Sequence, residues 1–128
     1  MGAGVSIGID VAQATLDVAV SPSGERWQVA NDARGIAELV PRLQALSPTL
    51  IVLEATGGLE LLLLAALGSA GQPVVAVNPR QVRDFAKAVG KLAKTDAIDA
   101  QVLAHFAEAV RPTVRPLPDA MTQTSPPW

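Results

Sequence analysis

Residues 5–31, VSIGIDVAQATLDVAVSPSGERWQVAN, hold three short apolar segments separated by brief polar connections. Residues 5–11 form an apolar run that contains a single carboxylate near its end, and residues 15–20 alternate apolar and polar side chains. Residues 26–31 form the third segment, after the turn sequence Ser-Pro-Ser-Gly. Each segment has the length and composition typical of a β-strand. Because connections this short join antiparallel neighbours, the stretch predicts a three-stranded antiparallel meander.

From Asp32 onward the apolar residues recur every three or four positions, which is the period of a helix. Asp32 is the predicted N-cap of the first helix, and Asn78 before Pro79 has the same role for a later one. Helices are predicted from Asp32 to Leu46 and at residues 59–70, 79–89 and 96–110, and strands at residues 49–53 and 73–77.

The two later strands are entirely apolar and are separated by helices, which is typical of parallel strands buried on both faces. The predicted element order is therefore βββαβαβαα. It indicates an α/β fold with a mixed sheet of about five strands flanked by helices on both sides.

The length of 128 residues suits one domain. Five prolines among residues 111–128, without any hydrophobic period, indicate a linker or disordered tail, so the predicted domain covers residues 1–110. The most apolar stretch, residues 59–77, is interrupted by a charged residue, two glycines and a proline, and no membrane span is expected.

The composition excludes several functions. There is no Cys, so disulfides, zinc fingers and thiol nucleophiles are excluded, which fits a reducing cytoplasm. A net charge of −2 argues against a general nucleic-acid coat, and any DNA contact must come from a local basic patch.

Two acids stand at the carboxyl ends of predicted strands, Asp10 on the first and Glu54 on the fourth. In open α/β sheets, ligands bind in the crevice at the carboxyl ends of the strands. If the two strands are neighbours, the two carboxylates face each other there. Each acid taken alone is better explained as an ordinary solvated residue at a strand end.

Two further acids, Asp96 and Asp99, begin the last predicted helix. At about 100° per residue they share an arc with the apolar side chains of residues 96–110, so they are expected to point toward the sheet. A capping arrangement, with Asp96 as N-cap and Asp99 three residues later, is the alternative and is compatible with metal binding. His105 lies on the opposite side of this helix and is expected at the surface.

The four acids together favour a divalent cation, because like charges within a few ångströms cannot all stay ionised without one. Mg²⁺ prefers oxygen ligands, and two such ions about 4 Å apart can activate an attacking oxygen and stabilise the leaving one at a phosphodiester. The candidate catalytic and metal-binding residues are Asp10, Glu54, Asp96 and Asp99.

Five of the ten basic residues fall in one short segment, at spacings of 3, 4, 4 and 3: Arg80, Arg83, Lys87, Lys91 and Lys94. On one continuous helix they occupy an arc of about 80°. Such a stripe suits phosphate-backbone binding beside a metal site. A solvated helix face is the common alternative, and a break at Gly90 would rotate the last two lysines away.

Three segments carry a resemblance to a known family: GIDVAQATLDVAV at 8–20, LEATGG at 53–58 and VNPRQVRDFAKAVGKLAKTDAIDAQVLAHFA at 77–107. In this order and spacing they strongly resemble the N-terminal domain of the DEDD transposases of bacterial insertion sequences. That domain is similar to the Holliday-junction resolvase RuvC. The resemblance extends over about residues 7–119 and implies an RNase H-like fold.

The resemblance also implies a function. It assigns Asp10, Glu54, Asp96 and Asp99 as the family's metal-binding set, with Mg²⁺ as cofactor. It implies DNA transposition by strand cleavage and exchange, with DNA and a structured guide RNA as partners, in a dimer or higher assembly.

In this family a second, C-terminal domain supplies a serine nucleophile. After Asp119 the sequence departs from the family pattern. A truncated product is therefore expected. Such a product would be inactive alone, or it would pair with a full-length transposase.

Two other functions stay open. Actin-like and sugar-kinase-type ATPase halves share the opening meander, but they need a glycine after the first Asp so that amides can approach phosphate. Here Val-Ala-Gln-Ala-Thr follows Asp10. A non-catalytic transposase remnant, acting as a binding or inhibitory module, would retain all four acids.

Overall fold

The computed structural model describes residues 4–88, 90 and 99–110, and the following account concerns those residues. In chain order the elements are β1 (Ser6–Val11), β2 (Thr15–Ser21), β3 (Arg26–Ala30), α1 (Ala33–Leu46), β4 (Leu50–Glu54), α2 (Leu61–Ser69), β5 (Val74–Val77), α3 (Pro79–Ala88) and α4 (Ala100–Val110). The predicted order βββαβαβαα is confirmed. The predicted tail, residues 111–128, lies outside the described residues.

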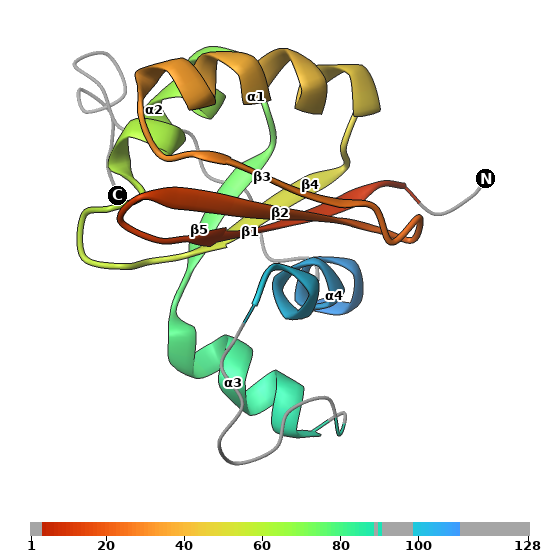
Figure 1. Ribbon diagram of the computed structural model, residues 1–128. Helices are drawn as coiled ribbons and strands as arrows, with labels where there is room; N and C mark the ends of the chain where they lie inside the picture. Colours follow the sequence, from red (N-terminus) through yellow and green to blue (C-terminus); the bar gives the residue numbers. More distant parts are fainter. Residues whose placement is uncertain (1–3, 89, 91–98, 111–128) are drawn as a thin grey trace, which may run out of the picture.

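The five strands form one mixed sheet in the order β3-β2-β1-β4-β5. The meander β1–β2–β3 is antiparallel, whereas β4 runs parallel to β1, and β5 runs parallel to β4. Figure 1 shows the sheet as a middle layer, with α1 and α2 on one side and α3 and α4 on the other. The predicted α/β mixed sheet with helices on both faces is therefore confirmed.

Under α1 and α2 the sheet presents a continuous apolar surface. Alternate residues of β1, β2 and β4 point to this face. The larger of these strand side chains are fully buried: Ile7, Ile9, Leu16, Val18, Ile51 and Leu53. They pack in one cluster with buried leucines of the two helices, Leu39 and Leu43 of α1 and Leu63 and Leu67 of α2. This cluster is the main core of the domain.

On the opposite face, α4 lies across β1, β2 and β4. A Cβ atom at Gly8 would collide with the backbone of α4, at the carbonyl of Ala100 and the amide of Ala104. Ala19, which pairs with Gly8 on β2, forms a small buried cluster with the same two alanines. Small side chains at this crossing therefore let the helix lie almost directly on the strands.

Two of the predicted helix starts are present. The Asp32 carboxylate accepts a hydrogen bond from the Gly35 amide at 2.7 Å and caps α1. The Asn78 side chain accepts from the Arg80 amide at 2.8 Å at the start of α3.

The end of α3 agrees to within one residue with the predicted helix at residues 79–89. The helix stops at Ala88, and Gly90 adopts a left-handed conformation with φ of 73°. A glycine without a Cβ enters this conformation readily, which ends the helix. The break at Gly90, which the sequence left open, is therefore present.

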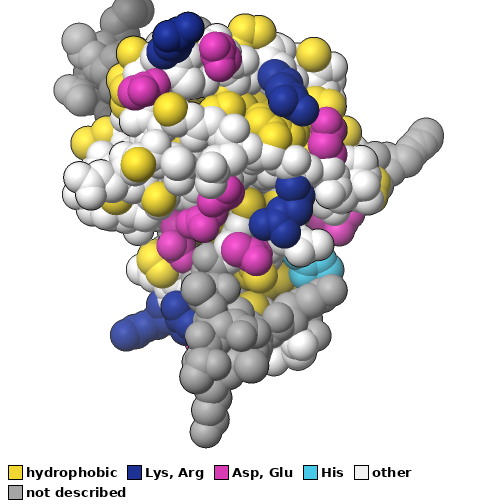
Figure 2. Space-filling model, viewed as in Figure 1, with side chains coloured by type: hydrophobic (Ala, Val, Ile, Leu, Met, Phe, Trp, Pro, Cys, Tyr) yellow, Lys and Arg dark blue, Asp and Glu magenta, His cyan; other side chains and the backbone are white. Residues whose placement is uncertain are grey.

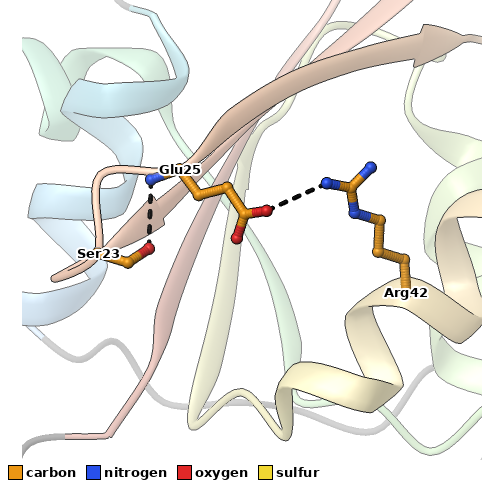
Figure 3. A network of polar contacts seen from close by, with 3 residues as sticks. All are labelled: Ser23, Glu25 and Arg42. Carbon is orange, nitrogen blue, oxygen red and sulfur yellow. Dashed lines mark hydrogen bonds and ion pairs between the residues drawn. The ribbon is translucent and has the colours of Figure 1, made fainter.

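A polar contact joins α1 to the β2–β3 hairpin at the rim of the main core. The Arg42 guanidinium forms an ion pair with Glu25 at 3.1 Å, and the Glu25 amide donates to the Ser23 hydroxyl at 3.2 Å (Figure 3). The same guanidinium lies 3.8 Å from the centre of the Trp27 ring. Arg42 and Glu25 are about half exposed, so the contribution of the pair to stability is small.

None of the helices in the described ranges combines the length and the apolar character needed to cross a membrane.

Candidate active site at the carboxyl ends of β1 and β4

Asp10 and Glu54 stand side by side at the same end of the sheet. Strands β1 and β4 are parallel neighbours with Ile9 paired to Leu53, and each acid is the next residue on its strand. Because side chains alternate along a strand, Asp10 points to the same face as Gly8, the α4 side. The metal-site prediction required the first and fourth strands to be neighbours, and they are.

The electrostatics of this pair reflect burial and like charge. Burial raises the pKa of the half-buried Asp10, and the nearby carboxylates of Asp17 and Asp99 raise it further. Burial, and to a smaller extent the Asp10 charge, also raises the pKa of Glu54, whereas the Arg83 guanidinium lowers it. Each acid is thus held where its ionised form is disfavoured unless a cation is present.

Asp99 acts on this group from the position just before α4. The helix begins at Ala100, so Asp99 precedes it, and the Asp99 carboxylate accepts from the Val102 amide at 2.9 Å. The predicted helical position of Asp99 was wrong, because this residue is itself the N-cap. Its charge nevertheless acts on Asp10. Asp96 lies outside the described residues.

One acid of this group was not predicted from the sequence. Asp17 lies directly opposite Asp10 in the β1–β2 ladder. Its Oδ1 accepts a hydrogen bond of 2.7 Å from the Gln28 side-chain amide on β3. The alternation in TLDVAV already puts Asp17 on the face opposite Leu16, but only the pairing of the strands shows that this face is the one carrying Asp10.

The acids therefore lie in a row across the sheet, in the order Glu54, Asp10, Asp17 on β4, β1 and β2. Figure 2 shows acidic side chains gathered where the sheet layer meets the lower helices. Within the described ranges, no three acids or histidines are grouped closely enough to form a metal site on their own.

The donor chemistry nevertheless fits Mg²⁺. This ion is usually held by one or two carboxylates together with water and phosphate oxygens. Asp10 and Glu54 supply two adjacent carboxylates. A bound cation would favour their ionised forms, which burial disfavours most, followed by the charges of Asp17 and Asp99 at Asp10 and the charge of Asp10 at Glu54.

The predicted basic residues are divided by the end of α3. Arg80 and Lys87 are exposed, and Arg83 is half-buried and acts electrostatically on Glu54. Lys91 and Lys94 lie outside the described residues. Arg83 is thus associated with the acids, whereas Arg80 and Lys87 present charge to solvent.

A cavity of about 320 Å³ lies between the β2–β3 hairpin and α4, with Arg26 and His105 among its lining residues. Of the described acids of this group, only Asp99 lines it. The His105 ring is half-buried and packs against Phe85, with ring centroids 5.4 Å apart. The expected surface histidine is therefore partly covered.

The fold resembles two solved structures. Thermus thermophilus RuvC in complex with a Holliday junction substrate is 20% identical over 90% of this chain and 100% of that chain, with a TM-score of 0.60. A second Thermus thermophilus RuvC structure is 20% identical over 92% of this chain and 85% of that chain, with a TM-score of 0.50. No curated protein matches the sequence at a significant level. The chain therefore has the RNase H-like fold of the RuvC type.

The sequence profile of the DEDD transposases of the IS110 type, described as "Transposase", matches residues 7–125. The chain therefore belongs to this transposase family, whose general activity is DNA transposition. The resemblance inferred from the three sequence segments is confirmed, and the match favours a transposase over an actin-like ATPase.

Proposed function

We propose that this chain is the metal-binding domain of its transposase and takes part in Mg²⁺-dependent DNA strand cleavage and exchange. The observation that carries the proposal is the placement of Asp10 and Glu54 side by side on the parallel strands β1 and β4, with the Asp99 charge acting on Asp10. In the RNase H-like fold these strand ends form the crevice in which a ligand is expected.

In this proposal the ligands of the cation are Asp10, Glu54, Asp96 and Asp99. When bound, Mg²⁺ would supply positive charge to the phosphodiester and acidify an attacking hydroxyl. Asp10 and Glu54 would hold the cation from the rigid sheet, whereas Asp99 would do so from the start of α4. Arg83 would limit the repulsion at Glu54.

Phosphate-backbone binding is proposed for the basic residues beside the acids: Arg80, Arg83, Lys87, Lys91 and Lys94. Positive charge next to a cleavage site positions the DNA without reading its sequence. The RuvC structure with a Holliday junction substrate supports DNA as the ligand of this fold.

Two further proposals come from the family resemblance, and a third comes from the composition of residues 111–128. A structured guide RNA is a proposed second nucleic-acid partner, and a second copy or a full-length transposase is a proposed protein partner. Residues 1–110 are the proposed folding unit. Because the resemblance assigns the serine nucleophile to another domain, metal and DNA binding are the properties to test in this chain.

Metal titration of the folded chain tests the proposal. Thermal unfolding is followed with increasing Mg²⁺ or Mn²⁺, for the wild type, Asp10→Asn and Glu38→Gln. At about ten times the dissociation constant, the wild type should gain roughly 5 °C in Tm. Asp10→Asn should abolish the gain, and Glu38→Gln, an exposed acid on α1, should retain it.

If metal raises the Tm of the wild type and of Asp10→Asn equally, the proposed metal site is wrong. The chain would then be better described as a transposase remnant that folds without a working metal centre.

A further inference from the structure

A polar bridge connects the loops that follow the two neighbouring acids. The side-chain amide of Asn31 donates to the carbonyl oxygen of Ala12, two residues after Asp10, at 2.8 Å. The same Nδ2 donates to the carbonyl oxygen of Leu59, in the loop after β4, at 3.3 Å. The Asn31 backbone amide also donates to the Ala14 carbonyl at 2.9 Å. One side chain thus ties the β1 loop to the β4 loop.

A buried carboxylate organises the second of these loops from within. Glu60 Oε1 accepts from the Thr56 hydroxyl at 2.6 Å, the Thr56 amide at 3.1 Å and the Gly58 amide at 3.1 Å. The residue is only 7% exposed. Burial alone would raise the pKa of Glu60, but the hydrogen bonds from Thr56, Gly58 and its own amide hold the pKa below the ordinary 4.5.

Apolar packing does not define the shape of this loop. Ala55, Gly57, Gly58 and Leu59 are exposed, and the two glycines have φ of 81° and 136°, where other residues are strained. The hydrogen bonds to Glu60 hold this conformation instead. Glu60 immediately precedes α2, whose Leu63 and Leu67 are fully buried in the main core.

We propose that Asn31 and Glu60 are positioning residues, which hold the loops after β1 and β4 together and so set the separation of the Asp10 and Glu54 carboxylates. The inference rests on the proposed function, because it concerns the same metal site. Asn31 acts through backbone carbonyl groups, and Glu60 acts through the Thr56 hydroxyl and the backbone amides of Thr56 and Gly58. Residues that orient metal ligands typically change metal affinity 10- to 100-fold when they are removed, as a general order of magnitude.

The test measures metal affinity and stability separately on the 128-residue chain. Mn²⁺ binding is measured by isothermal titration calorimetry at a temperature at which every variant is folded. Thermal unfolding in EDTA gives the stability without metal. The variants are Asn31→Ala, Glu60→Ala and Glu60→Gln, which keeps an acceptor oxygen.

Asp32→Ala is the matched control. It neighbours Asn31 and loses the carboxylate that caps α1, which should cost about 1 kcal/mol. Its hydrogen bond does not belong to the bridge between the two loops.

Asn31→Ala and Glu60→Ala should each weaken Mn²⁺ binding about tenfold, and Glu60→Gln should recover most of the loss. Asp32→Ala should lower Tm in EDTA but bind Mn²⁺ like the wild type. A purely structural role predicts a lower Tm with unchanged affinity in all variants, and that result overturns the inference. Should Glu60→Ala not fold, Asn31→Ala decides the question.

The failure of the inference is distinguishable from that of the proposed function. If Asp10→Asn loses Mn²⁺ binding while Asn31→Ala binds like the wild type, only the positioning role is wrong. If the wild type and Asp10→Asn respond to Mn²⁺ alike, there is no site to position, and both proposals fall.

Discussion

The two faces of the central sheet are built from the same strands and both bury apolar side chains, but they differ in side-chain size at the centre and in charge at one end. The face under α1 and α2 is covered by branched apolar side chains such as Ile9, Leu53 and Leu43, all fully buried. The face under α4 has Gly8 and Ala19 at its centre and a row of carboxylates at its carboxyl end. Because successive side chains of a strand point to opposite faces of the sheet, the branched apolar side chains and the carboxylates lie on different faces.

This difference shows how one sheet can keep both a core and a site of repelling charges. The apolar face supplies most of the burial that stabilises the domain. The acidic face carries groups whose burial raises their pKa and which repel one another. Changes on the first face should therefore affect stability, whereas changes on the second should affect metal binding.

The largest expected effect lies on the apolar face. Leu43→Ala removes a fully buried side chain of α1 and should lower the free energy of unfolding by about 3 kcal/mol. Urea denaturation in EDTA measures this loss. The Mn²⁺ affinity of the folded protein should stay at the wild-type value, and a parallel loss of affinity would show that the two faces are not separate.

A smaller effect with a different signature is expected at Gly8. Gly8→Ala places a Cβ against the Ala100 and Ala104 backbone of α4 and should cost about 2 kcal/mol. Displacement of α4 also carries Asp99 with it, so Mn²⁺ affinity should fall. Gly24→Ala is the control: it strains a left-handed turn residue with open space around it, and its affinity should be unchanged.

The pH dependence of stability tests the row of acids. In EDTA, the raised pKa values of Asp10 and Glu54 mean that the folded protein binds protons more tightly than the unfolded chain. Stability should therefore fall as pH rises from the ordinary values of 3.8 and 4.5 through the raised ones. Glu60, with its lowered pKa, contributes in the opposite sense below pH 4.5.

Asp17→Asn isolates the contribution of the missed acid. Because the Asp17 charge raises the pKa of Asp10, its removal should flatten the fall of stability with rising pH. The effect of Glu60 cancels in the difference between the two proteins. Thermal unfolding between pH 4 and 8 measures the pH dependence of stability of both proteins. If stability changes with pH to the same extent in the wild type and in Asp17→Asn, the charge of Asp17 does not act on Asp10.

The smallest effect is expected at the rim of the apolar face. Arg42→Gln removes a half-exposed ion pair and a contact with Trp27 and should cost less than about 1 kcal/mol. The loss should shrink further at high salt. Urea titrations at low and high salt measure the loss. If Arg42→Gln lowers the free energy of unfolding more than Gly8→Ala does, the expected order of these effects is wrong.

Much of the fold was predictable because local periods report local structure. The change from alternating to helical spacing predicted all nine described elements in order, and the caps Asp32 and Asn78 lie where the sequence placed them. The two strand-end acids, Asp10 and Glu54, were also identified from the apolar runs before them. These features depend on neighbours only a few residues away.

Three features were missed or wrong, one because it depends on strand pairing and two because the detailed geometry of a loop or a helix start does not follow from side-chain periodicity. Asp17 was overlooked because its closeness to Asp10 exists only in the β1–β2 register. Glu60 was noted only as an interruption of an apolar run, although its carboxylate organises the loop after β4. The wheel placed Asp99 inside a helix that begins one residue later.

The sequence by itself determined the order of helices and strands, the apolar and polar faces of each, and the family to which the chain belongs. Only the tertiary structure decided that β1 lies between β2 and β4, which brings Glu54, Asp10 and Asp17 into one row. The physical reason is that side-chain periodicity is set within each segment, whereas strand order and register arise from contacts between segments far apart in the chain.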